Sequence, residues 1–146
     1  MNAKRILMGG TIAGVMVAGG ETLLAMWLVR RDTTGLVAEA VSATPFGIFM
    51  LKSFSLGLCC VLLYALIRPR IGAGARTAIT AGLLAFLLGV LFPSFGDTMS
   101  GAFPSNLLLI SIIWGAVELP IASLLGAYLY QEQSGPAPGS FASNAI

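Results

Sequence analysis

Residues 107–130 read LLLISIIWGAVELPIASLLGAYLY, and this stretch decides the fold. It exceeds the roughly 20 apolar residues that a helix needs to cross a membrane. Its only charged side chain is Glu118, and Pro120 follows two positions later. The stretch therefore predicts a membrane-spanning helix that carries a carboxyl group near its middle.

Three earlier segments are also long and apolar enough to form spanning helices. The four predicted spans are residues 6–29, 46–67, 77–95 and 107–130. Pro93 is expected to bend or stop the third span near its end, because proline has no backbone N–H to donate. We predict an all-α polytopic membrane protein, with one four-helix domain over residues 1–130. The Gly-, Pro- and Ser-rich tail, residues 131–146, is expected to be flexible.

The composition agrees with residence in a membrane and excludes several classes of protein. Hydrophobic residues make up 57% of the chain and charged residues only 10%, with a mean hydropathy of +0.91. Soluble domains carry about a quarter charged residues. There is no histidine, and the two cysteines, Cys59 and Cys60, are adjacent rather than spaced as metal ligands are. We therefore expect no metal, no cofactor and no nucleic-acid partner.

The basic residues predict the orientation of the chain. Lys4 and Arg5 precede the first span, and the connection between the second and third spans contains Arg68, Arg70 and Arg76. The connection on the opposite side holds Arg30 and Arg31. Because cytoplasmic loops carry the excess of basic residues, both termini are predicted to be cytoplasmic. The three arginines of the second-to-third connection are expected to contact anionic lipid headgroups.

Small residues recur at intervals that favour close packing between helices. Helices in lipid associate where small side chains let their backbones approach. The candidate packing residues are Gly10, Gly14, Ala18, Gly115, Ala122 and Gly126. Glu21 lies seven positions beyond Gly14, and Glu118 three beyond Gly115, so both acids should face other helices rather than lipid.

The intramembrane charges admit three interpretations. A charge at the bilayer centre costs about 2.5–3.5 kcal/mol on insertion scales, which calls for a partner or a function. Glu21 and Lys52 both fall roughly 8–9 Å below the outer boundary, so they form a candidate pair, while Glu118 lies deeper, at roughly 16 Å. A protonated Glu118 would then bond to a carbonyl, for which Pro120 frees the one on Ala116. Alternatively, the acids line a proton or cation path, or they contact the helices of a larger assembly.

Three segments carry a resemblance to a known family. They are KRILMGGTIAG (residues 4–14, followed by Glu21), YALIRPRIGAGARTA (residues 64–78) and WGAVELPIASLLGAYLY (residues 114–130). Their IRPR turn and WG-x-x-E pattern resemble those of a family of small, uncharacterised bacterial membrane proteins with four predicted helices. The resemblance implies a multi-pass protein of the bacterial cytoplasmic membrane, and it implies no activity or cofactor. Lys52 is not part of the family pattern.

We expect a non-enzymatic protein, because no nucleophile–base pair or metal-ligand set is evident. The first hypothesis is an accessory or structural subunit of a larger membrane complex, such as a respiratory or photosynthetic assembly, whose partners are lipids and other subunits. The alternative is a proton- or cation-coupled transporter or channel that acts as a homo-oligomer. In that case Glu118 would carry the proton and Glu21 would line the outer access route.

Overall fold

The structure, a computed structural model, describes residues 3–101 and 104–130, and these residues are almost entirely helical. The helices are α1 (Ala3–Arg31), α2 (Leu36–Ala43), α3 (Phe46–Ile71), α4 (Ala75–Phe86), the π-helical segment η1 (Leu87–Leu91), α5 (Phe92–Ser100) and α6 (Ser105–Leu129). Four helical stretches are long and apolar enough to cross a membrane: α1, α3, the continuous run Ala75–Ser100, and α6. The predicted all-α class with four candidate spans is thus confirmed. The predicted tail, residues 131–146, lies outside the described residues.

All four helices extend beyond the predicted spans at one end or at both. The third differs most, because it continues to Ser100 although Pro93 interrupts its ladder. The N–H of Phe92 bonds to the carbonyl of Leu87, five residues back, and Pro93 then occupies the first turn of α5, where an N–H is not needed. Pro93 therefore does not stop the helix, because the π turn before it compensates for the backbone N–H that proline lacks.

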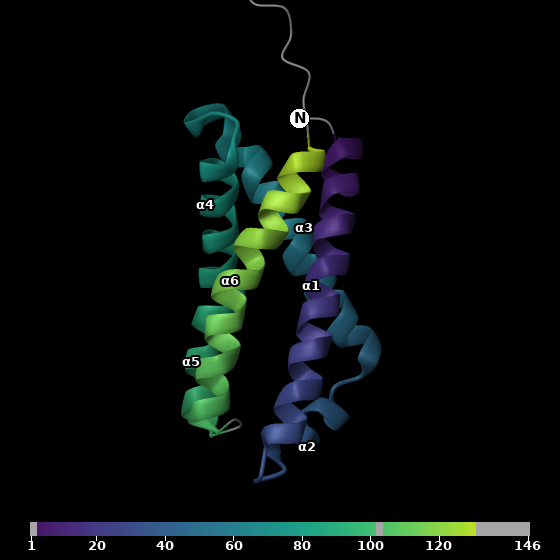
Figure 1. Cartoon of the computed structure of the whole chain (residues 1–146), viewed down its shortest axis with the longest axis vertical. Helices are drawn as coiled ribbons and strands as arrows, with labels where there is room; N and C mark the ends of the chain where they lie inside the picture. The colour runs from purple at the N-terminus through teal and green to yellow at the C-terminus, as the bar shows by residue number, and fades with distance from the viewer. Residues whose placement is uncertain (1–2, 102–103, 131–146) are drawn as a thin grey trace, which may run out of the picture.

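The four long helices form a bundle whose two ends differ. α1 packs against α3 and α6, and α4 packs against the same two helices from the other side. α1 begins and α6 ends at one end of the bundle, which we call the terminal end (Figure 1). α2 and α5 lie at the opposite end, which we call the α2 end (Figure 1).

Close backbone contacts join the helices in the terminal half of the bundle. A Cβ added to Gly57 of α3 would lie 2.5 Å from the carbonyl carbon of Ala13, and one added to Gly9 would lie 2.6 Å from the carbonyl oxygen of Gly126. A Cβ on Gly82 of α4 would lie 2.5 Å from Cα of Pro120. Each crossing therefore has a glycine where another residue would separate the helices, as expected for helices that pack in lipid.

The predicted packing residues occupy different helix faces. Gly10 and Gly14 pack against α3, at Leu58 and Phe54, and Gly126 packs against Val61. Gly115 faces η1 instead, where an added Cβ would lie 3.1 Å from the Val90 side chain. Ala122 is fully buried, whereas Ala18 is only half-buried. Gly9, Gly57 and Gly82, which form the three crossings, were not among the predicted residues.

An acidic cap holds α2 across the α2 end. The Asp32 carboxylate accepts hydrogen bonds from the Thr34 hydroxyl (2.6 Å), the Thr34 N–H (2.9 Å) and the Val37 N–H (2.7 Å). These bonds, led by the Thr34 hydroxyl, hold the pKa of Asp32 below its ordinary value. Val37 is buried together with Leu28 of α1 and Leu107 of α6, so α2 is packed against these two helices at this end.

We predict that Gly57→Ala destabilises the bundle, because its methyl group would collide with backbone atoms of α1 that cannot rotate away. Overpacking of this kind costs about 1–3 kcal/mol. Gly19→Ala is the matched control, since it lies within α1 and an added Cβ meets nothing within 4 Å. Thermal unfolding in detergent should show a lower midpoint for Gly57→Ala alone. Equal midpoints for the two variants would contradict the assigned α1–α3 crossing.

Candidate functional site

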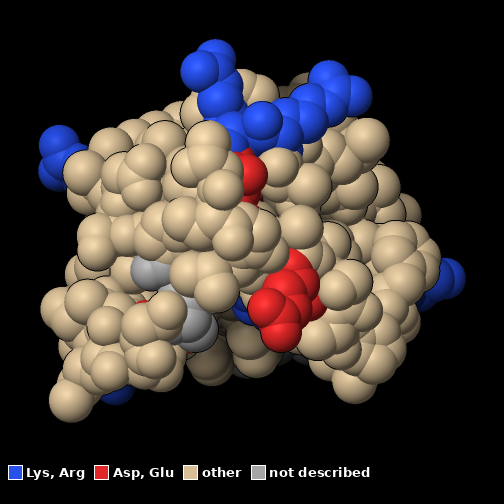
Figure 2. All heavy atoms as spheres, turned by 90° about the horizontal axis from the view of Figure 1, so that it is seen from below, with Lys and Arg blue, Asp and Glu red and all other residues tan. Residues whose placement is uncertain are grey.

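The α2 half of the bundle contains a cavity of about 850 Å³. Its walls come from all four long helices and from α2, in the half where the glycine crossings are absent. Figure 2 views the α2 end and shows acidic side chains beside a recess between the helices. The crossings close the terminal half, so the cavity is a cup that opens toward the α2 end.

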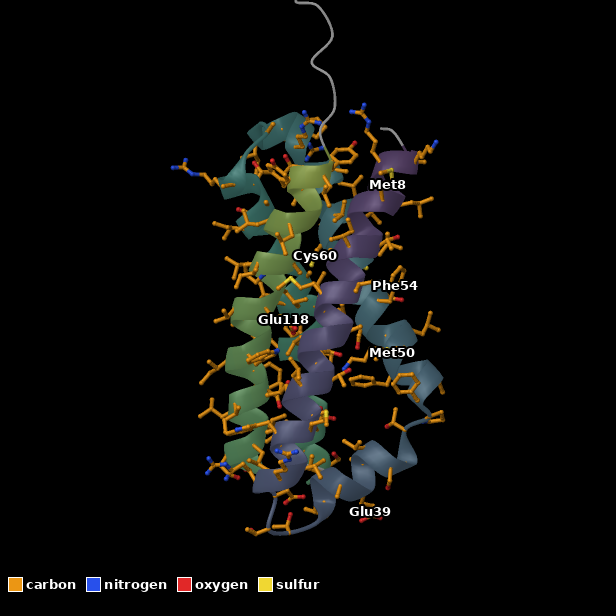
Figure 3. All side chains as sticks on the ribbon, turned by 45° about the vertical axis from the view of Figure 1, so that its right-hand side comes forward. Met8, Glu39, Met50, Phe54, Cys60 and Glu118 are labelled. Atoms are coloured by element: carbon orange, nitrogen blue, oxygen red, sulfur yellow. The ribbon has the colours of Figure 1, made fainter. Side chains whose placement is uncertain are left out.

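Glu118 lies in the bundle interior and borders the cavity. Its side chain is only 6% exposed, and Figure 3 shows it between the helices, with Cys60 nearby in the terminal half. The carboxyl group packs on α1 at Gly20, where an added Cβ would lie 2.9 Å from Cδ of Glu118. The indole ring of Trp114, one turn earlier on α6, packs at the same glycine, with Cζ2 3.5 Å from the position of that Cβ. Glu118 thus reaches the backbone next to Glu21.

Glu21 is bonded to α3 through a serine. The Ser53 hydroxyl is fully buried, contacts the Glu21 carboxyl oxygen and lies 3.0 Å from the carbonyl oxygen of Phe49. A hydroxyl group has one hydrogen, so it cannot donate fully to both oxygens. Both bonds form when Glu21 carries a proton and donates it to Ser53, which donates in turn to Phe49. The arrangement therefore accommodates a protonated Glu21.

The ion pair that the sequence suggested between Glu21 and Lys52 does not form in the structure. Ser53, not Lys52, faces Glu21, and adjacent residues of a helix point about 100° apart. Lys52 is exposed and lies on the cavity wall. Among the described residues, no lysine or arginine forms an ion pair with Glu21 or Glu118. The two carboxyl groups thus border the cavity without an ion pair, while Lys52 and Arg30 line other parts of its wall.

The remaining cavity walls offer few free polar groups. The hydroxyls of Ser94 and Ser111 bond to carbonyls of their own helices, at 2.7 and 3.2 Å. Arg30 and Asp97 also line the cavity, but both are exposed near the α2 end. The two glutamates and Lys52 are therefore the main polar groups of the cavity away from the α2 end.

The terminal half holds other polar residues outside the cavity. The Cys60 thiol lies 3.8 Å from the carbonyl oxygen of Leu119, and the fully buried Ser123 hydroxyl has no hydrogen-bond partner among the described residues. The predicted headgroup-binding residues Arg68, Arg70 and Arg76 lie at the terminal end of α3 and α4. The guanidinium of Arg68 stacks 5.7 Å from the centre of the Tyr130 ring.

Gly20, Ser53 and Trp114 are site residues that sequence analysis did not identify. Gly20 precedes Glu21 directly, and Trp114 lies four residues before Glu118, so a search for neighbours of the acids would have found these two. The contact between Ser53 and Glu21 depends on how α1 and α3 are aligned, which the sequence does not reveal.

No group of three or more potential metal ligands occurs within residues 3–101 and 104–130. No protein-family model, curated protein or solved structure matches the chain.

We predict that a cysteine at position 111 reacts with a water-soluble methanethiosulfonate reagent, whereas one at position 123 does not. Ser111 lines the open cavity and Ser123 is fully buried in the closed half, yet both lie on α6. The variants Ser111→Cys and Ser123→Cys would be made in a background with Cys59 and Cys60 replaced by alanine. Mass spectrometry measures the labelled fraction. Equal labelling at both positions would contradict a cup closed at its terminal side.

Proposed function

We propose that the chain is a multi-pass integral membrane protein that binds and exchanges a proton or cation at Glu21 and Glu118, as a coupled transporter or channel. The supporting observation is that two carboxyl groups border one cavity and that, among the described residues, neither forms an ion pair. Ionisable residues within a membrane commonly mark ion and proton pathways. The function would reside in a bacterial cytoplasmic membrane, with both termini cytoplasmic because the basic residues gather at the terminal end.

The closeness of the two acids supports exchange. The Glu118 carboxyl group packs on Gly20, which is bonded directly to Glu21. Two neighbouring negative charges in a poorly solvated site repel each other, so ionising both carboxyl groups costs free energy. The pair therefore favours binding a proton or a cation between its two groups. A cation that enters would release the proton, which couples the two species.

Transport would also require movement in the terminal half. Its glycine crossings close the cup, and the cavity does not extend through them. Two irregular segments flank the site: the π turn η1 in the third span, and Pro120 in α6, which leaves the carbonyl of Ala116 without its helical donor. These are the positions where the helices can bend to open the closed side. A homo-oligomer would supply further walls for a continuous path.

Glu118→Gln is expected to reduce proton flux about tenfold or more, because glutamine is close in shape but cannot release a proton. Protein reconstituted in liposomes with an enclosed pH-sensitive dye measures the flux under an imposed cation gradient. Glu39→Gln is the matched control, since Glu39 is exposed on α2 and does not line the cavity. Unchanged flux in Glu118→Gln would refute the proposal.

The second candidate function is the accessory subunit predicted from the sequence. An opening of the cavity in the side of the bundle favours it. Met26 of α1 and Phe46 and Ile48 of α3 line the cavity and are also more than half exposed on the bundle. A partner helix carrying a basic side chain would fill this opening and pair with the acids. Purification in mild detergent tests this: one defined partner should co-purify and dissociate in Glu118→Gln. A chain purified alone from its native membrane would contradict it.

A further inference from the structure

We propose that the ligand of this cavity is a lipophilic organic monocation, such as a substituted ammonium or phosphonium ion, with its charge held at Glu21 and Glu118. This inference rests on the proposed function and specifies the class of cation. Size, wall chemistry, aromatic groups and access each support it.

The volume of the cavity suits a molecule rather than a bare ion. Pockets for drug-sized ligands have volumes of roughly 300–1,000 Å³. The present cavity, at about 850 Å³, lies in the upper part of that range. A proton or an inorganic ion would leave nearly all of this space unfilled, whereas a cation with several ring or alkyl substituents would fill it.

The walls are too apolar to replace the water shell of an inorganic cation. Hard cations need about six oxygen ligands in a protein site. Here the free oxygens in the deep part belong to Glu21 and Glu118, since the hydroxyls of Ser94 and Ser111 are bonded to helix carbonyls. An organic cation needs fewer polar ligands, because its charge is already surrounded by carbon. Its substituents would instead contact the apolar wall residues, among them Leu24, Leu28, Val90, Leu108 and Leu119.

Aromatic side chains stand on two sides of the cavity. Trp114 of α6 lies beside the Glu118 carboxyl group, and Phe46 and Phe49 of α3 line the wall from another helix. The faces of aromatic rings attract cations, most strongly when the cation has lost its water. The carboxyl groups would thus neutralise the charge while the rings contact the substituents.

A lateral opening provides access from the lipid. The exposed residues Met26, Phe46 and Ile48 form part of the cavity wall, so the cavity reaches the outer surface of the bundle between α1 and α3. A lipophilic ligand concentrates in the membrane and would enter through this opening. Binding is non-covalent: the cation takes the place of one carboxyl proton, and that proton passes to water at the α2 end.

The test uses tetraphenylphosphonium as the cationic probe and triphenylphosphine oxide as a neutral analogue of similar shape. Isothermal titration calorimetry on the full-length protein in detergent should show binding of the cation. Glu118→Gln should weaken it at least tenfold, whereas Glu39→Gln should leave it unchanged. The neutral analogue should show no dependence on Glu118. In weakly buffered solution, binding of the cation should release up to one proton per site.

A second variant keeps the test decisive if Glu118→Gln fails to fold, as judged by circular dichroism. Ser111→Trp fills the cavity without changing either acid, and it should also abolish binding of the cation. Binding that survives both Glu118→Gln and Ser111→Trp would overturn the inference, because the probe would then reside outside the cavity. Absence of binding, together with proton flux that still depends on Glu118, would overturn the inference and leave the proposed function standing. Absence of both would remove both proposals.

Discussion

The close approach of helix backbones in the terminal half is the constraint on which the rest of the structure depends. At three crossings a glycine takes the place of a side chain: Gly57 against α1, Gly9 against Gly126, and Gly82 against Pro120. In lipid, no hydrophobic force draws one helix to another, so close packing has to supply the association. Because all three crossings lie in one half, the helices diverge in the other half.

That divergence creates the cavity and determines what borders it. Glu118 lies two residues before Pro120, at the level where the close packing ends. Gly20 provides the space that its carboxyl group occupies, because any side chain at that position would collide with it. The crossings and the acid site are therefore parts of one arrangement. A change that spread the terminal half would also move Glu118 away from Glu21.

The two acids are tolerated because each has a polar side chain beside it. Glu21 contacts Ser53 of α3, and Glu118 has the indole of Trp114 within reach. Neither contact supplies a positive charge. The bundle thus holds two carboxyl groups at its cavity without an ion pair, as the proposed function requires. A site made only for stability would pair such groups or bury them with full hydrogen bonding.

The sequence by itself determined the class of fold, because runs of apolar residues near the length of a bilayer permit little besides spanning helices. It also identified Glu21 and Glu118, since a charged residue in such a run stands out. It did not determine the partner of Glu21. Lys52 and Ser53 are adjacent on α3, and the rotation of that helix about its axis decides which of them faces Glu21. It did not show that a π turn accommodates Pro93. Nor did it show that Gly9, Gly57 and Gly82 make the crossings, while Gly19 and Gly47 contact nothing. Those outcomes depend on how the helices cross and rotate against one another, and only the tertiary structure decided that.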